Sequence, residues 1–220
     1  MAPGSLIHVV SGNPDAKRDI DETRPDCTVE IQATLGDTTD PGVLAMLGLT
    51  EYAHAIVLCD EHLEAQQADS RTLITLLHLR DIAGRLGAQV SVVSEMADDR
   101  NRDLAPLTEA DDFIVSQKLI SLLMTQIAEN HHLADVFAAL FRGEGPEINL
   151  KPAEDYVRLG REMNFYTVTE AARRQGEVAI GYRRLALASQ GPRFGVTVNP
   201  DKQQPVRFQP GDRIVVLDAG

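Results

Sequence analysis

The chain has no tryptophan and only two cysteines among its 220 residues. Cys27 and Cys59 do not form a CxxC pair, and both have apolar, strand-like neighbours. Such cysteines indicate buried, reduced thiols rather than a disulfide or a metal site. A basic and apolar leader is also missing, because residues 1–5 run directly into the strand-like Leu6 to Val10. We therefore expect no secretion signal and a location in the cytoplasm.

Positive charge is scarce as well. The 21 lysines and arginines face 33 aspartates and glutamates, which gives a formal net charge of -12. This balance repels a phosphate backbone, so we expect no nucleic-acid partner. The longest apolar runs, such as Ala55 to Cys59 and Ile214 to Leu217, are far shorter than the roughly 20 residues of a membrane-spanning helix. We expect a soluble chain that does not insert into a membrane.

The sequence lacks the short motifs of common cofactors and enzymes. No G-x-G-x-x-G follows the first predicted strand, where Ser11-Gly12-Asn13-Pro14 stands instead, so nucleotide binding to this chain is not expected. No G-x-S-x-G run is present, and no two histidines have the i, i+4 spacing of a zinc-binding helix. The sequence therefore predicts no certain cofactor, no catalytic residue and no enzymatic activity.

What the first 140 or so residues do contain is an alternation of short β-rich runs and helical patterns. This alternation predicts βαβ units, and hence an α/β fold with a Rossmann-like parallel sheet. The runs are apolar throughout rather than alternating, which predicts strands buried on both faces. The predicted strands are Leu6 to Val10, Thr28 to Ala33, Ala55 to Cys59, Gln89 to Val93 and Asp112 to Val115.

Two predicted helices have clear end signals. Asp40 precedes Pro41 at the start of a helix that runs to Leu49, which is the pattern of an N-cap followed by proline. A longer helix is predicted over Ser70 to Leu86, with Gly87 closing it. Asp69 then reads as its N-cap, and Arg71 either flanks that cap or pairs with an acidic group or anion.

The segment 118–142 is more apolar than a surface helix requires, and it breaks near Glu129 to His132. We expect two helices with a turn, forming a crossover between two lobes. Its apolar face predicts a homo-oligomer interface, although docking onto the chain's own sheet would explain it equally well. The predicted interface residues are Leu119, Leu122, Leu123, Ile127, Val136, Phe137, Leu140 and Phe141.

Turn residues at Arg142 to Pro146 mark the boundary of a second lobe. Short strands around one helix, Thr167 to Gln175, and many Gly/Pro turns predict a small α+β unit there. The predicted division is residues 1–117 for the first lobe, 118–142 for the crossover and 147–220 for the second lobe.

Carboxylates follow two neighbouring strands of the predicted parallel sheet. Asp60 and Glu61 come after the third strand, and Glu95 and Asp98 come after the fourth. Ligands of α/β proteins bind at this edge, and clustered carboxylate oxygens hold Ca²⁺ or Mg²⁺. These four residues are therefore predicted metal ligands, and the alternative is that they are helix caps and solvated loop charges.

Six runs of the sequence stand out together, in collinear order. They include Ala68-Asp69-Ser70-Arg71-Thr72-Leu73, Val93-Ser94-Glu95, and Lys151-Pro152-Ala153-Glu154-Asp155-Tyr156. The others are Arg80-Asp81-Ile82, Ile180-Gly181-Tyr182-Arg183 and Val198-Asn199-Pro200-Asp201-Lys202. Together these runs resemble the Castor and Pollux family of ion channels. The resemblance implies cytosolic RCK domains (regulators of K⁺ conductance), in which a Rossmann-like lobe, a helix-turn-helix crossover and a small TrkA-C-like lobe form a gating ring. Pro210-Gly211-Asp212 and the strand after it resemble the closing turn of that small lobe.

The resemblance also implies a function. The chain would be a regulatory domain on the cytoplasmic side of a membrane, where it would sense a ligand, with Ca²⁺ as the one to test, and oligomerise to control a cation channel or transporter. Its partner would be a pore domain on the same or a separate polypeptide. Family members have a first strand and helix before the segment that begins here, so the first βα unit is missing. The alternative is a free-standing TrkA-like, nucleotide-binding subunit of a K⁺ uptake system.

Overall fold

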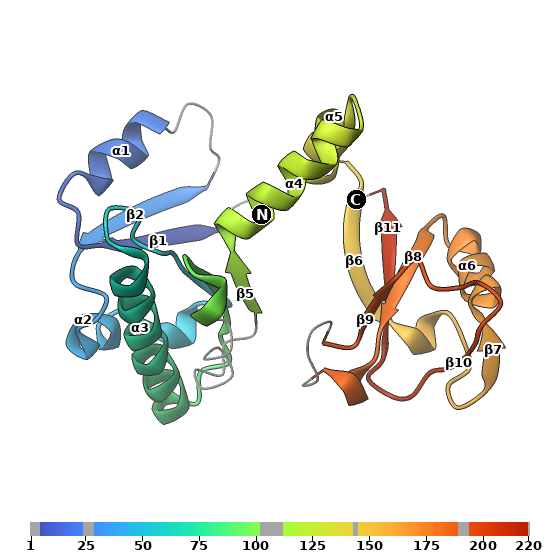
Figure 1. Cartoon of the computed structure of the whole chain (residues 1–220). Coiled ribbons are helices and arrows are strands. Elements are labelled where there is room, and N and C mark those ends of the chain that lie inside the picture. Colours follow the sequence, from blue (N-terminus) through green and yellow to red (C-terminus); the bar gives the residue numbers. More distant parts are fainter. Residues whose placement is uncertain (1–4, 24–28, 102–111, 143–144, 189–193, 220) are drawn as a thin grey trace. The chain divides into compact units, whose positions relative to one another are not determined.

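The structure, a computed structural model, describes residues 5–23, 29–101, 112–142, 145–188 and 194–219. The chain divides into two compact units, residues 1–125 and 126–220, which are described separately (Figure 1). Cys27 lies outside the described residues. The helices of the described residues include none with the length and apolar character needed to cross a bilayer.

The first unit contains two parallel sheets. Strands β1 (Leu6–Ser11) and β2 (Glu30–Leu35) pair in parallel, and β3 (His54–Val57), β4 (Ser91–Met96) and β5 (Asp112–Val115) form a three-stranded parallel sheet in that order. All five strands overlap the predicted ones. The prediction of an α/β fold with parallel strands is therefore confirmed.

Helices α1 (Ala16–Thr23), α2 (Pro41–Ala45) and α3 (Ala65–Leu86) connect these strands, with a 3-10 turn at Leu49–Glu51. The predicted N-cap is confirmed, because Asp40 accepts a hydrogen bond from the Gly42 amide at 2.7 Å. Gly87 ends α3 in the left-handed region with φ 65°, as its position predicts.

The prediction for the start of α3 was wrong. The helix begins at Ala65 instead of Ser70, so Asp69 lies inside it rather than at the N-cap. The residue that precedes the helix, Glu64, makes no side-chain cap. A helix whose first turn lacks a capping side chain leaves little trace in the sequence.

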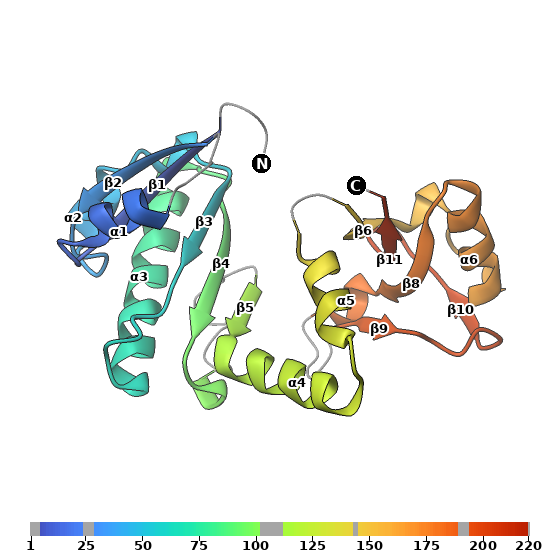
Figure 2. The ribbon, with the colours of Figure 1, turned by 90° about the horizontal axis from the view of Figure 1, so that it is seen from above.

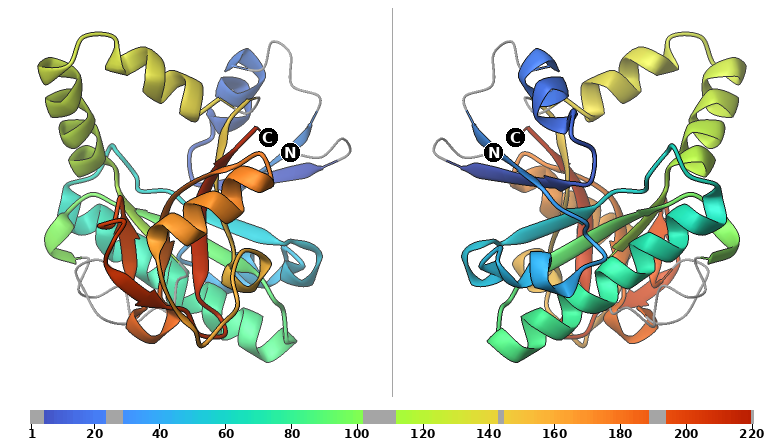
Figure 3. Two further views of the ribbon diagram at one scale, coloured as in Figure 1. Left: turned by 90° about the vertical axis from the view of Figure 1, so that its right-hand side faces the viewer. Right: turned by 90° about the vertical axis from the view of Figure 1, so that its left-hand side faces the viewer.

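The core of the first unit lies on one side of the three-stranded sheet, where α3 covers it (Figure 3). Leu76 of α3 and Val92 and Met96 of β4 have no exposed side-chain surface. Residues of β4 alternate between buried and half-buried, and neither β1 nor β3 has a buried residue. The prediction of strands buried on both faces was therefore wrong, because the buried residues of β4 all lie on the face that α3 covers.

Helices α4 (Ser116–Glu129) and α5 (Leu133–Leu140) follow β5. The chain turns between them at His132, which takes the left-handed conformation with φ 65°. Neither helix has a buried side chain among the described residues. The two predicted helices are thus present with their turn.

The second unit is built on an antiparallel sheet in the order β6 (Glu147–Pro152), β11 (Arg213–Asp218), β8 (Val178–Arg183) and β9 (Val196–Val198). Helix α6 (Phe165–Arg174) packs on this sheet, and Asn164 caps it by accepting from the Thr167 amide. Two three-residue strands, β7 (Glu162–Asn164) and β10 (Pro205–Arg207), pair beside it and were not predicted. The core consists of fully buried side chains that include Phe165, Val168, Phe208, Ile214 and Val216.

The turn before β11 is held by its aspartate. Asp212 is 3% exposed, and its two carboxylate oxygens accept from the amides of Leu185 and Gln209 at 2.9 and 2.8 Å. Gly211 has φ 87°, and a Cβ there would lie 2.6 Å from the Leu185 side chain. Only glycine fits this position without strain, which explains the Pro-Gly-Asp run.

A polar cluster joins β6, β11 and the residue before β8 in the same sheet. Lys151 of β6 lies 2.7 Å from the carboxylates of Glu177 and Asp218, and the Tyr156 hydroxyl donates to Glu177. Hydrogen bonds from Lys151 and Tyr156 lower the pKa of Glu177, whose side chain is 9% exposed. Burial and then the bond to Glu177 raise the pKa of Tyr156. The buried glutamate is therefore ionised at neutral pH.

Candidate functional site

The carboxyl ends of β3 and β4 lie beneath the first turns of α3, at the edge where α/β folds bind their ligands. Asp69, in the second turn of α3, is 1% exposed. A buried carboxylate is costly unless several donors satisfy it, so its contacts define the site.

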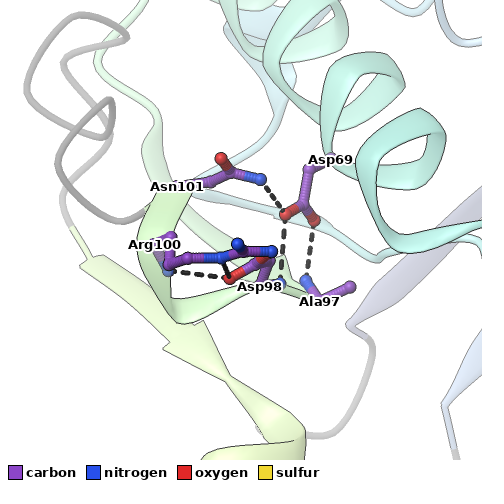
Figure 4. A network of polar contacts seen from close by, with 5 residues as sticks. All are labelled: Asp69, Ala97, Asp98, Arg100 and Asn101. Carbon is purple, nitrogen blue, oxygen red and sulfur yellow. Dashed lines mark hydrogen bonds and ion pairs between the residues drawn. The ribbon is translucent and has the colours of Figure 1, made fainter.

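Asp69 binds the segment that follows β4 (Figure 4). Its Oδ1 accepts from the Ala97 amide at 2.7 Å, and its Oδ2 accepts from the Asp98 amide at 3.1 Å and from Asn101 Nδ2 at 2.6 Å. The thiol of Cys59 lies 3.9 Å from Oδ1 and donates to it. One carboxylate thus connects α3, the end of β3 and the end of β4.

Glu95 makes a second connection between the two strand ends. Its Oε2 accepts from the Cys59 amide at 3.1 Å. Neighbouring Ser94, which has no exposed surface, donates its hydroxyl to the Val57 carbonyl at 3.4 Å. These contacts fix the chain where it leaves β3.

Cys59 lies in a negatively charged environment. Burial raises the pKa of its thiol first, and the charges of Asp69, Glu95 and Asp60 raise it further. The thiol is free and half-buried. It is therefore protonated at neutral pH, which makes it a poor nucleophile. The prediction of a buried thiol is only partly met, because Cys59 is half-buried.

The four predicted metal ligands have different surroundings. Asp60 accepts from the His62 amide at 3.1 Å, and Glu61 is exposed. Asp98 accepts from Arg100 Nε at 2.9 and 3.0 Å, and these bonds lower the pKa of Asp98. Among the described residues, no three His, Cys, Asp or Glu side chains are placed to hold a metal ion. Glu95 and Asp98 both belong to the Asp69 site, but by different contacts. Glu95 accepts from the Cys59 amide, and the Asp98 amide donates to Asp69.

Arg71 pairs with an acidic side chain, which was one of the two roles predicted for it. Its Nη2 lies 2.7 Å from Asp37 Oδ1, just beyond the end of β2. Hydrogen bonds from Thr39, with the charge of Arg71, lower the pKa of Asp37. Near them, Thr75 of α3 donates to the Thr38 hydroxyl at 3.3 Å. The end of β2 is thereby joined to α3.

The turn after β1 uses its own side chains to satisfy its amides. Asn13 N donates to Ser11 Oγ at 3.1 Å, and Asp15 N donates to Asn13 Oδ1 at 3.0 Å. Free amides in such a turn are what bind a phosphate, and these two amides already have acceptors.

The second unit has a shallow pocket of its own. It is lined by residues that include Phe165, Tyr182, Arg184, Asp201 and Gln204. The Arg184 guanidinium lies 5.9 Å from the centre of the Tyr182 ring. The pocket is thus aromatic on one side and carries both signs of charge.

The predicted interface residues lie on α4, on α5 and just after it. Leu119, Leu122, Ile127, Val136 and Phe141 are between 36% and 67% exposed. The other three, Leu123, Phe137 and Leu140, are half-buried. The rings of Phe137 and Phe141 stack with centroids 6.2 Å apart. No residue of the predicted set is buried within the described chain.

Comparison with known proteins identifies relatives of this chain. No protein family model matches the chain. The probable ion channel CASTOR of Oryza sativa is 30% identical over 254 residues, which covers 99% of this chain and 28% of the channel. The ion channel DMI1 of Medicago truncatula is 28% identical over 257 residues, covering 100% and 28%. The chain is homologous to the CASTOR and POLLUX ion channels.

A further relative in this group, the ion channel CASTOR of Lotus japonicus, is 32% identical over 169 residues, which covers 64% of this chain and 20% of the channel. The chain thus spans less than a third of the curated channels that it matches. These CASTOR and POLLUX relatives are ion channels and not enzymes, in agreement with the expectation from the sequence.

Two solved structures align with the chain at low similarity. The GsuK RCK domain has a TM-score of 0.40 at 14% identity, covering 97% of this chain and 43% of that one. The NAD(P)-binding domain of an exopolyphosphatase-related protein from Archaeoglobus fulgidus has a TM-score of 0.42 at 13% identity, covering 56% and 80%.

Sequence reasoning missed Asp69 as the centre of the site. Its spacing gave a usable signal, since a helix extended by one turn places Asp69 on the same face as Thr72 and Leu76, both of which are buried. A charged residue on a buried face indicates a set of buried donors.

Proposed function

We propose that the chain is a cytosolic RCK-type regulatory domain of a CASTOR/POLLUX-type ion channel. Homology to these channels over the whole chain carries the proposal. Under it, the domain lies on the cytoplasmic side of a membrane beside a pore domain. Residues 1–117 form the N-terminal lobe, 118–142 the crossover and 147–220 the C-terminal lobe.

The Asp69 site supports a regulatory role in physical terms. A ligand shifts a conformational equilibrium only if it binds two arrangements with different affinity. At this edge, one carboxylate joins three elements through short hydrogen bonds. A bound cation that competed for Asp98 or Glu95 would change the contacts of the segment that Asp69 binds, and a coupling of about 1–3 kcal/mol is typical of such switches.

The ligand that we propose to test first is Ca²⁺, with Asp60, Glu61, Glu95 and Asp98 as its ligands. These oxygen donors follow two adjacent strands. The charges of Glu95 and Asp60 both raise the pKa of the Cys59 thiol, as expected for carboxylates that lie near one another. Binding would require Asp98 to exchange its bonds from Arg100 for the ion. This exchange lowers the expected affinity, because Arg100 neutralises part of the charge.

The test is a thermal-shift titration of the full chain with Ca²⁺, Mg²⁺ and K⁺, and with NAD⁺ and ATP to examine the nucleotide-binding alternative. A ligand that prefers the folded state raises Tm by mass action. A Ca²⁺ shift that Glu95→Gln removes, and that the exposed control Asp81→Asn retains, supports the proposal. Equal shifts in both variants would place the ion elsewhere.

We further propose that the chain forms a homo-oligomer through α4 and α5. The exposed apolar residues of these helices support this proposal. Light scattering should show that Leu122→Asp with Phe141→Asp lowers the mass of the particle. Met46→Asp is the matched control, because Met46 is 81% exposed on another part of the chain. A wild-type chain that is monomeric at every concentration contradicts the proposal.

A further inference from the structure

The pocket of the second unit is formed by the start of α6, the end of β8 and the loop that leads from β9 to β10, elements that can be followed in Figure 2. Phe165 and Tyr182 line it with their rings, and Pro200 and Pro205 add further apolar surface. Its volume is about 80 Å³, far below the roughly 300–1,000 Å³ of pockets that enclose a drug-sized ligand. The pocket therefore fits a group of only a few atoms.

Arg184, the residue after β8, brings an unused hydrogen-bond donor to this pocket. Its Nη2 donates to the Arg207 carbonyl at 3.4 Å. Its Nε is buried, and no described residue accepts a hydrogen bond from it. A buried donor without an acceptor costs free energy, so such a group in a native protein calls for a partner.

Asp201 brings a carboxylate to the same pocket. Its Oδ1 accepts from the Gln203 amide at 2.9 Å, and no described residue donates to its Oδ2. No ion pair joins Asp201 to Arg184, although both line the pocket. Two opposite charges that share a pocket without pairing are available to the opposite charges of a ligand.

The loop that carries Asp201 is held in place by Lys202. The ammonium of this lysine donates to the Pro200 carbonyl at 3.0 Å and lies 5.1 Å from the centre of the Phe165 ring. Its carbonyl accepts from the Tyr166 amide at 3.4 Å. The loop is thereby tied to the first turn of α6, so the charged groups of the pocket are positioned before a ligand arrives.

We propose that this pocket binds the zwitterionic head group of a free α-amino acid. The ligand's carboxylate accepts from the Arg184 guanidinium, whose planar fork of donors matches two carboxylate oxygens. Its ammonium donates to Asp201. The bond from Nη2 to the Arg207 carbonyl is long, so a small rotation of the guanidinium brings Nε to the ligand at little cost.

Ligands with a single charge use only half of the site. A simple carboxylate satisfies Arg184, but it shares the pocket with the carboxylate of Asp201, which repels it. A simple amine binds Asp201 and leaves Arg184 Nε without an acceptor. A zwitterion satisfies both groups. The pocket is too small for more than the head group, so the ligand's side chain lies at the open mouth and the site selects the class rather than one amino acid.

Backbone-amide NMR spectra of the full chain, titrated with glycine and alanine, test the site. The amides of Tyr182, Arg184 and Gln204 should shift and reach saturation. Acetate and methylammonium, each of which carries one of the two charges, should bind at least about tenfold more weakly. This test involves no metal ion and does not depend on the Ca²⁺ proposal.

Two variants separate the two halves of the site. Arg184→Gln should weaken alanine binding at least about tenfold, whereas the control Arg183→Gln, at the adjacent position outside the pocket, should bind alanine as the wild type does. Asp201→Asn should weaken alanine binding but strengthen acetate binding, because the repelling charge is gone. Asp201 is exposed, so this variant keeps the test decisive if Arg184→Gln does not fold.

Three outcomes overturn the proposal. Alanine gives no saturable shift at any concentration up to its solubility, which leaves the pocket to water. Arg184→Gln and Arg183→Gln bind alanine equally well, which places the ligand elsewhere. Acetate binds as tightly as alanine and is unaffected by Asp201→Asn, which reduces the pocket to a site for simple anions.

Discussion

We expect the carboxylate of Asp69 to have a larger effect on stability than its position near the start of a helix suggests. Replacement by asparagine keeps the shape but turns one acceptor oxygen into a donor. If Oδ1 is replaced, the amide of Ala97 and the thiol of Cys59 lose their acceptor. If Oδ2 is replaced, the Asp98 amide and the Asn101 side chain lose theirs.

Each buried donor left without an acceptor costs about 1–3 kcal/mol, and the bonds that remain lose the assistance of the charge. We therefore expect Asp69→Asn to lower the free energy of unfolding of the first unit by about 3 kcal/mol. The corresponding fall in Tm is about 6–12 °C for a protein of this size.

Urea unfolding followed by circular dichroism measures this change. Asp81→Asn on the same helix is the matched control, because Asp81 forms an exposed i, i+4 pair with Arg85 at 2.6 Å. Such a pair is worth about 0.3–0.5 kcal/mol. If the two variants unfold at the same urea concentration, Asp69 does not hold these elements together and the reasoning is refuted.

Three other predictions concern separate parts of the chain. The pKa of Glu177 is lowered in the folded state, so the stabilisation by its ionised carboxylate is present above its ordinary pKa of 4.5 and is lost as the pH falls below that value. Glu177→Gln should lower the free energy of unfolding by about 2 kcal/mol at neutral pH, and its free energy of unfolding should fall less steeply with acid than that of the wild type. An unchanged dependence on acid would show that the Glu177 cluster does not stabilise the unit. Gly211→Ala should destabilise the second unit by at least about 2 kcal/mol, because the added Cβ sits at a positive φ and clashes with Leu185. Gly176→Ala is the control for backbone strain alone, since φ there is 80° but no atom lies near the added Cβ, and it should destabilise the unit less. In a Cys27→Ser background, Cys59 should react with iodoacetamide more slowly than a free thiol at pH 8, because its pKa is raised; a faster reaction would contradict the protonated, structural thiol.

Local signals predicted the parts of the fold that local chemistry determines. The cap at Asp40, the end of α3 at Gly87 and the turn near His132 each depend on a few adjacent residues. The Pro-Gly-Asp turn was visible for the same reason. Its function, in which Asp212 holds the distant Leu185 amide, was not visible because that contact spans 27 residues.

The donors that bind Asp69 and the exposure of β3 could not be predicted in this way. Both depend on parts of the chain that are distant in sequence. The donors to Asp69 follow β4, and β3 is an edge strand among the described residues. The missed strands β7 and β10 have three residues each, which is too short for any periodicity to be seen.

The place of β11 in the second unit has a consequence for biosynthesis. This strand follows all other described strands in the sequence, yet it pairs with β6 on one side and β8 on the other. On the ribosome, β6 and β8 emerge first and have no partner between them until residues 213–218 leave the exit tunnel. The second unit therefore completes its sheet only after β11 has been synthesised, and a mutation that removes β11 takes away an inner strand of the sheet rather than its margin.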